Sequence, residues 1–285
     1  MSLKKILFKL YTWNLQRSPI LVIGQGRSGT TVIQQSLGQC PSILTTPKES
    51  PLVGEIGRVI HLTQFNKESD YFKESSNSDL ADIEELFHKI NLYYGIGNKR
   101  GKKSFLKDLV GLKYIFRPKY WMVKAFPTEE SFKGLMHLYP DLKAIYIYRN
   151  GFDQINSSMK HSSFKGKEFT EYCRLYNHFY EKYHYLEKSE NAYCLKHEDL
   201  IEDPKFHLSE IYEFLDIDYY PGSLKFLQNN LIHPLDNPSK IKTEKANEII
   251  KNRTPVWSEW TDEQKETFKK TCSKVMLKRG YDIPF

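Results

Sequence analysis

The sequence predicts an α/β fold in which a central parallel sheet is flanked by helices. Short apolar runs rich in β-branched or aromatic residues predict buried strands at 20–23, 120–124, 142–148 and 192–195. Segments with apolar residues at helical spacing separate these runs, and strands that alternate with helices form parallel sheets. The chain has 285 residues, of which 40% are hydrophobic, so we expect one domain over 1–285.

Helices are expected in the segments between these strands. Pro41 is expected to end the first helix, because the residue before a proline disfavours helical geometry. Thr128 is placed to cap the helix after the second strand, and Asn150 to Asp153 form the turn that starts the helix after the third. The predicted helices cover 31–39, 47–64, 82–90, a segment that starts at Thr128, a segment that starts near Asp153, 168–186, 204–215 and 261–278.

The segment that follows the first strand has the composition of a phosphate-binding loop. Three glycines allow unusual backbone angles and let main-chain N–H groups approach an anion, and hydroxyls follow at the positive end of a helix. A nucleoside triphosphatase loop carries lysine after its last glycine, where this chain has Thr30, so a different anion is expected. The alternative is an ordinary strand–turn–helix. The candidate binding residues are Gln25, Gly26, Arg27, Ser28, Gly29, Thr30 and Thr31.

A second candidate anion site follows the third predicted strand. Arg149 stands at the carboxyl end of that strand, where open α/β sheets bind ligands. Ser157 lies eight residues further on, about two helical turns into the next helix. A guanidinium and a hydroxyl in this arrangement can converge on a phosphate. A surface salt bridge is the alternative for Arg149.

Together the two segments resemble the sulfotransferases that use 3′-phosphoadenosine 5′-phosphosulfate (PAPS). Residues 196–204 are similar to the family's Tyr-Glu-Asp-Leu…Pro segment, and residues 138–143 to its lead into the second phosphate unit. The resemblance covers 18–50 and 120–285, and it implies the P-loop-like fold of that family. Residues 52–118, which it does not cover, are expected to form a helical insertion on the acceptor side.

The resemblance also implies roles for individual residues. Loop residues 25–31 would bind the 5′-phosphosulfate, and Arg149 with Ser157 the 3′-phosphate. His197 stands where the family has an adenine-facing tyrosine. Lys251 and Arg253 are candidates for a further 3′-phosphate contact. For His197 the alternative is a purely structural side chain. For Lys251 and Arg253 the alternative is a solvated basic loop.

The catalytic residues depend on the branch of the family. The cytosolic branch has lysine where this chain has Arg27, and a catalytic histidine that is missing from Lys124-Ala125-Phe126-Pro127. Arginine in the loop is more similar to the tyrosylprotein, Golgi carbohydrate and bacterial sulfotransferases. In the tyrosylprotein type a glutamate about twenty residues beyond the loop is the base. Glu49 is therefore the candidate base, Glu55 is the alternative carboxylate, and Arg27 is expected to stabilise the departing phosphate.

The resemblance implies an enzyme that moves a sulfuryl group from PAPS, without a metal, to a hydroxyl or amine of a carbohydrate, lipid, peptide or small molecule. The alternatives are a P-loop kinase or nucleotide hydrolase dependent on Mg²⁺ and ATP, and a non-catalytic nucleotide-binding module. The net charge of +7 suits an anionic donor. Nucleic acid is not an expected partner, because no recognition helix, zinc finger or RNA-binding motif is present.

The cysteines and the first residues give expectations about location. Four scattered cysteines have neither metal-binding spacing nor a dense disulfide framework, which favours a reducing, cytoplasmic environment. An excised luminal domain of a Golgi enzyme is the alternative. Residues 1–13 are basic and partly apolar, but this segment is too short to cross a bilayer. We expect a helix there that packs on the domain or rests on a surface, and no transmembrane segment.

Overall fold

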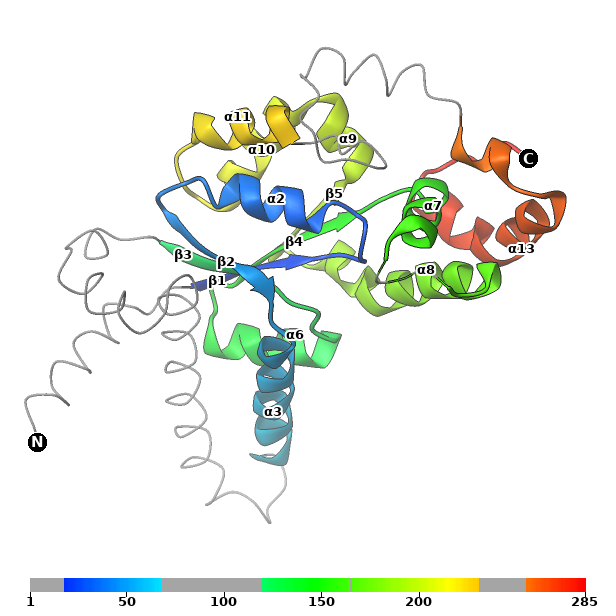
Figure 1. Ribbon diagram of the computed structural model, residues 1–285. Helices are drawn as coiled ribbons and strands as arrows, with labels where there is room; N and C mark the ends of the chain where they lie inside the picture. Colours follow the sequence, from blue (N-terminus) through cyan, green and yellow to red (C-terminus); the bar gives the residue numbers. More distant parts are fainter. Residues whose placement is uncertain (1–17, 68–118, 163, 165, 231–254) are drawn as a thin grey trace, which may run out of the picture. The chain divides into compact units, whose positions relative to one another are not determined.

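The computed structural model describes residues 18–67, 119–162, 164, 166–230 and 255–285 (Figure 1). The expectations for 1–13, for the helix at 82–90 and for most of 52–118 lie outside the described residues, as do Lys251 and Arg253. The described residues form two compact units. The first draws on residues up to Val22 and on Cys40–Ala144, and the second on Ile23–Gln39 and on residues from Ile145 onward.

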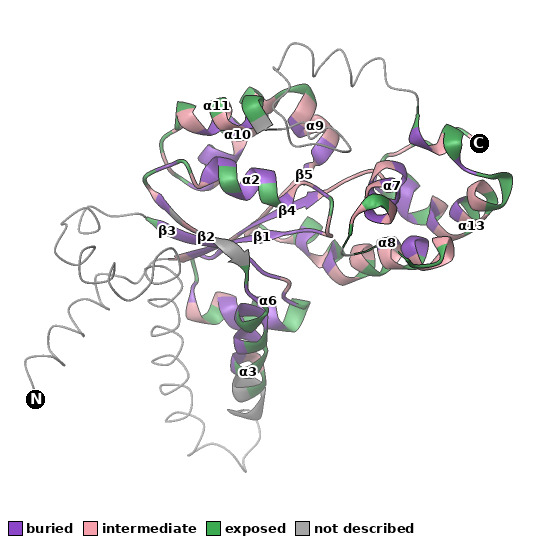
Figure 2. Ribbon diagram, in the orientation of Figure 1, coloured by how far each residue is buried: buried purple, intermediate pink, exposed green. Residues whose placement is uncertain are grey.

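The sheet has five strands in the spatial order β2-β3-β1-β4-β5. β1 pairs in parallel with β3, from Ser18 opposite Tyr120 to Val22 opposite Lys124, and β2 is also parallel to β3. Most residues of β1, β3 and β4 are buried (Figure 2), as expected for strands covered on both faces. The predicted α/β fold class is confirmed. The strands are β1 (Ser18–Ile23), β2 (Ile43–Glu49), β3 (Tyr120–Lys124), β4 (Lys143–Tyr148) and β5 (Ala192–Lys196).

The helices α3 (Pro51–Lys67) and α6 (Glu129–Leu138) of the first unit cross in backbone contact. A Cβ atom on Gly134 would lie 2.0 Å from the carbonyl oxygen of Gly57, and one on Gly57 would lie 2.2 Å from that of Ser131. Only glycine permits so close an approach at these two positions. The predicted cap is confirmed, since the Thr128 hydroxyl accepts a hydrogen bond from the Ser131 amide at 3.3 Å.

The prediction of a helix over 47–64 is wrong at its beginning. β2 continues to Glu49, and α3 begins only at Pro51. Pro47 does not exclude a strand here, because β2 lies at the edge of the sheet, where a missing N–H donor is tolerated. The pairing of β2 with β3 is irregular between Thr45 and Glu49.

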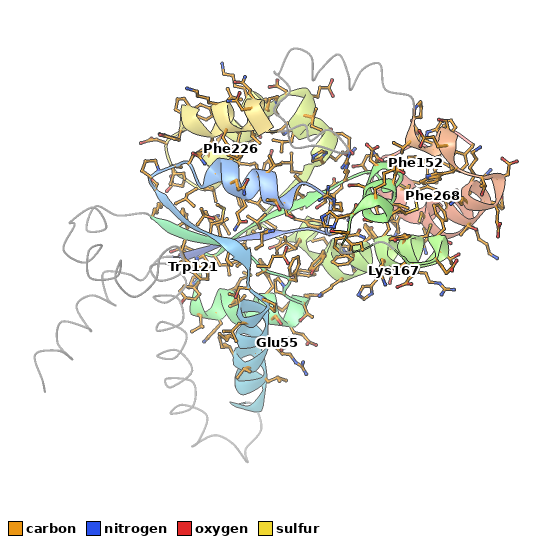
Figure 3. All side chains as sticks on the ribbon, viewed as in Figure 1. Glu55, Trp121, Phe152, Lys167, Phe226 and Phe268 are labelled. Carbon is orange, nitrogen blue, oxygen red and sulfur yellow. The ribbon has the colours of Figure 1, made fainter. Side chains whose placement is uncertain are left out.

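The second unit contains most of the described helices. The predictions for 31–39, 168–186, 204–215 and 261–278 are confirmed within a few residues, whereas the sequence patterns do not predict α9 and α11. One core lies among α7, α8 and α13, where Phe152 stacks on Phe268 with ring centroids 4.6 Å apart (Figure 3). The helices are α2 (Thr30–Leu37), α7 (Gly151–Lys160), α8 (Phe169–Tyr183), α9 (His197–Glu202), α10 (Pro204–Phe214), α11 (Pro221–Asn230) and α13 (Asp262–Lys278), with 3₁₀ turns at His184–Lys188 and Val256–Glu259.

Two further observations concern the chain's chemistry. The four cysteines are free thiols, and three of them are buried. In the part of the chain that the structure describes, no helix has both the length and the apolar character needed to cross a membrane.

Candidate functional site

The glycine-rich loop begins where β1 ends, and it folds back tightly on itself. The Gln25 carbonyl accepts hydrogen bonds from both the amide and the hydroxyl of Ser28, at 3.1 and 2.7 Å. Arg27 has a φ of +72°, an unusual conformation for a residue with a side chain. A Cβ atom on Gly24 would lie 2.3 Å from the Ile147 carbonyl oxygen, and one on Gly26 would lie 2.9 Å from the Phe164 ring. The loop therefore needs glycine at position 24, where the neighbour is backbone, whereas a side chain at position 26 would have to displace the ring of Phe164.

The loop leads directly into the N-terminus of α2. Gly29 is the N-cap residue, and none of the described side chains caps the helix there. The first turn of α2 contains no acidic residue that would neutralise the positive end of the helix dipole. Thr30 is buried and Thr31 is exposed. An uncapped helix start behind a glycine-rich loop is a favourable place for an anion.

The two predicted anion-binding segments meet within the second unit. Arg27 Nε donates a hydrogen bond to Ser157 Oγ on α7, at 3.0 Å. Arg149 Nη1 contacts the Arg27 carbonyl oxygen at 3.4 Å, and Gln154 Nε2 donates to the Gly26 carbonyl oxygen at 3.1 Å. The structure thus brings together the loop, the end of β4 and the first turns of α7.

The two arginines of this site lie close together, with Arg149 partly buried and Arg27 exposed. Desolvation, followed by the positive charge of Arg149, lowers the pKa of Arg27. Arg149 forms an ion pair with Asp153, with Nη2 and Oδ2 3.3 Å apart. Its Nε is buried and has no hydrogen-bond partner among the described residues. An anion with several oxygen atoms would supply acceptors for these donors.

His197, the first residue of α9, packs against the loop. A Cβ atom on Gly29 would lie 2.5 Å from His197 Cδ2, so the imidazole lies directly against this glycine. The side chain is buried, and burial together with the charge of Arg149 lowers its pKa to about 3. His197 is therefore neutral at physiological pH and supports the loop. Contact with an adenine base stays a prediction.

Three residues outside the set of candidate binding residues hold the end of β4. Tyr176 of α8 donates a hydrogen bond from its hydroxyl to the Arg149 carbonyl oxygen at 3.4 Å. Met276 of α13 accepts from the Gly151 amide through its sulfur at 3.2 Å. Glu198 accepts from the Asn150 amide at 3.1 Å. Glu198 lies within the segment 196–204 that resembles the family, but no local pattern predicts any of these three contacts, because each joins residues far apart in sequence.

The candidate base lies in the first unit. Glu49 is the last residue of β2, and its Oε1 lies 3.1 Å from Nζ of Lys124, the last residue of β3. The Lys124 side chain is only 9% exposed, whereas that of Glu49 is 54% exposed, so the carboxylate is fixed by a buried cation but reaches solvent. The alternative carboxylate, Glu55, is exposed on α3 (Figure 3).

No group of three or more histidine, cysteine or acidic side chains that could hold a metal ion occurs among the residues that the structure describes.

The family of the chain follows from comparisons with known proteins. The model of the Sulfotransferase family matches residues 19–221. The chain is also similar to the solved sulfotransferase domain of the curacin biosynthetic pathway, with 16% identity, coverage of 94% of this chain and 99% of that chain, and a TM-score of 0.47. It is similar to mouse SULT7A1 in complex with PAP, with 14% identity, 91% and 84% coverage, and a TM-score of 0.49.

A third similar structure is STF9 from Mycobacterium avium, with 13% identity, coverage of 98% of this chain and 82% of that chain, and a TM-score of 0.45. No curated protein matches the chain. The family model spans β1, the glycine-rich loop and the arginine at the end of β4, and it extends beyond α9 and α10. On the strength of that match over more than half its length, this chain belongs to the sulfotransferase family.

Proposed function

We propose that this protein transfers a sulfuryl group from PAPS to a hydroxyl or amine of an acceptor molecule. The acceptor is a carbohydrate, a lipid, a peptide or a small molecule. Membership of the sulfotransferase family supports the reaction class and does not favour the kinase alternative. The observation that carries the choice of donor is the 3.0 Å hydrogen bond from Arg27 Nε to Ser157 Oγ. This contact joins the segment expected at the 5′-phosphosulfate to the residue expected at the 3′-phosphate.

The charge of the site supports a donor with more than one anionic group. Arg27 and Arg149 repel one another, and desolvation adds a cost for the charge of Arg27 when no anion is bound. The buried Arg149 Nε adds a hydrogen-bond donor without a protein acceptor among the described residues. Two phosphate groups would relieve the repulsion and accept from these donors. A donor such as PAPS therefore fits the residues present.

The proposed chemistry needs two contributions: a base that removes the acceptor proton, and positive groups that stabilise the departing phosphate. PAPS supplies a sulfuryl group bonded to a phosphate oxygen that leaves. The Glu49 carboxylate takes the acceptor proton while the acceptor oxygen or nitrogen forms its bond to sulfur. Arg27 and the amides of the loop stabilise the electron pair that remains on the phosphate oxygen, a type of contribution of about 3 kcal/mol per donor. The ion pair with the buried Lys124 keeps the Glu49 carboxylate in place.

Calorimetric titration with 3′-phosphoadenosine 5′-phosphate (PAP) tests the proposed donor. AMP and ATP serve as comparison ligands, each with and without Mg²⁺. We expect PAP to bind more tightly than AMP without added metal. Arg149→Ala should weaken PAP binding by about 10- to 100-fold, because a hydrogen bond to a charged group contributes about 1.5–3 kcal/mol. The affinity for AMP, which lacks the 3′-phosphate, should change little.

Arg174→Ala is the matched control, since Arg174 is exposed on α8 of the same unit. It removes the same charge from the protein and should leave the PAP affinity unchanged. Equal affinities for PAP and AMP in the wild type, or binding of ATP only with Mg²⁺, would show that the donor is not PAPS.

A further inference from the structure

We infer that Glu198 is a positioning residue that holds the 3′-phosphate arginine, Arg149, in its binding orientation. The inference rests on the proposed function, because it concerns the 3′-phosphate half of that site. Glu198 is the second residue of α9 and is half-buried. Its effect on Arg149 passes through Asn150, the residue that follows the arginine in the chain.

The Glu198 carboxylate fixes the backbone immediately after Arg149. Its Oε1 accepts two hydrogen bonds from Asn150, from the backbone amide at 3.1 Å and from Nδ2 at 2.8 Å. Because the backbone amide and the side-chain amide of Asn150 both donate to this oxygen, the contact fixes the direction of the strand end and the rotamer of Asn150. Hydrogen bonds to a charged acceptor are about twice as strong as neutral ones, so this contact is a firm one.

Asn150 passes this constraint to Arg149 through the first turn of α7. Asn150 Oδ1 caps the helix by accepting from the Asp153 amide at 2.8 Å, and Asn150 Nδ2 lies 3.3 Å from Asp153 Oδ2. The same Asp153 oxygen holds Arg149 Nη2 at 3.3 Å. A continuous path of polar contacts therefore leads from Glu198 through Asn150 and Asp153 to the guanidinium.

The second carboxylate oxygen of Glu198 ties the path to the last residues of the chain. Tyr281 donates a hydrogen bond from its hydroxyl to Glu198 Oε2 at 2.8 Å. Burial, followed by the negative charge of Glu198, raises the pKa of Tyr281, so the phenol keeps the proton that it donates. The ammonium group of Lys196 lies 5.0 Å from the centre of the Tyr281 ring and adds a cation–π contact.

Both carboxylate oxygens of Glu198 accept hydrogen bonds, which explains how this negative charge is tolerated beside an anion site. Glu198 points its oxygens at neutral donors, Asn150 and Tyr281, and the carboxylate that pairs with Arg149 is that of Asp153. Its charge also lies at the N-terminal end of α7, where the helix dipole favours an anion. Glu198 therefore organises the site without occupying the position of a phosphate.

The test compares PAP with AMP, because the two ligands differ in the 3′-phosphate. Glu198→Ala should weaken PAP binding by about tenfold, which corresponds to 1.4 kcal/mol, while the AMP affinity changes less than about twofold. Glu198→Gln keeps an acceptor oxygen and should restore part of the difference. Glu202→Ala, an exposed glutamate at the other end of α9, is the matched control and should behave as the wild type. A purely structural role would instead lower both affinities together.

Hydrogen–deuterium exchange supplies a readout that needs no ligand. Glu198→Ala should speed exchange of the peptide that covers 149–157, and Glu202→Ala should not. An unchanged ratio of PAP to AMP affinity in Glu198→Ala, together with unchanged exchange in this peptide, would overturn the inference. If Glu198→Ala does not fold, Glu198→Gln tests the inference instead. Its ratio of PAP affinity to AMP affinity should be about two- to fivefold below that of the wild type. If the wild type itself does not prefer PAP, the proposed donor fails and the exchange measurement alone decides the role of Glu198.

Discussion

Replacing Gly29 by alanine should destabilise the protein for two separable reasons. The first is the backbone, because Gly29 has a φ of +101°, and a left-handed conformation costs a residue with a side chain about 1–2 kcal/mol. The second is steric, because the new Cβ atom would lie 2.5 Å from His197 Cδ2. The imidazole is buried and cannot swing into solvent, so we expect an overpacking cost of about 1–3 kcal/mol. The sum is about 2–5 kcal/mol, or at least about 4 °C in Tm.

Thermal unfolding of three variants separates the two contributions. Gly166 has a φ of +93°, but a Cβ atom at this position would have no neighbour within 4 Å among the described residues, so Gly166→Ala isolates the backbone contribution. Gly29→Ala should lower Tm clearly more than Gly166→Ala does. In a double-mutant cycle with His197→Ala, the steric part should disappear, which gives a coupling of about 1–3 kcal/mol. Equal Tm losses for the two glycine variants, or no coupling to His197, would refute the placement of the imidazole against the loop.

Three further predictions concern other parts of the chain. Gly134→Ala should lower the free energy of unfolding, measured in urea, by about 2 kcal/mol or more, because the Cβ atom would lie 2.0 Å from the Gly57 carbonyl oxygen. This loss is expected despite the higher helix propensity of alanine. A neutral effect would contradict the close crossing of α3 and α6. His197→Gln should reduce the loss of unfolding free energy at acid pH. The imidazole has a pKa of about 3 in the folded protein and 6.5 in the unfolded chain. The free energy of unfolding of the wild type is therefore unaffected above pH 6.5 and falls by about 1.4 kcal/mol per pH unit from there towards pH 3. Parallel acid slopes in the two proteins would rule out a buried neutral imidazole. Glu49→Gln should lower kcat by about 10²–10⁴-fold with the PAP affinity unchanged, and an effect on PAP affinity alone would exclude the role of a base.

The sequence is sufficient for the strands and helices whose patterns are local. The apolar run at 20–23 lies within β1, the run at 142–148 covers β4, and the threonine cap at 128 is confirmed. β2 is not predicted, because Pro47 argues against a strand, although the β-branched Ile43 and Thr45 before it favour one. The edge position of β2 resolves this conflict, and that position is a property of the sheet that no local segment contains.

The candidate site is predictable to the extent that short motifs describe it. The glycine-rich loop, Arg149 and Ser157 can be identified, since their spacing reflects a strand end followed by a helix, and the second unit brings them together. The resemblance implies that His197 faces the adenine, which stays a prediction; its packing against Gly29, which supports the loop, is a contact that the sequence does not predict. Glu198 lies within the motif segment 196–204, but its contact with Tyr281 carries no local signal, because this hydrogen bond joins residues 83 positions apart.

The contacts around the glycine-rich loop also set an order of events during synthesis. The loop is made early, yet its hydrogen bond to Ser157 spans 130 positions, and the carboxylate behind Arg149 reaches Tyr281. Contacts of such long range form late and slowly, because a long stretch of chain must first be closed into a loop. A nascent chain therefore has an incomplete loop until Ser157 and Tyr281 have both emerged from the ribosome. If PAP binds at this loop as proposed, nascent chains that end before Tyr281 should bind it more weakly than chains that include Tyr281.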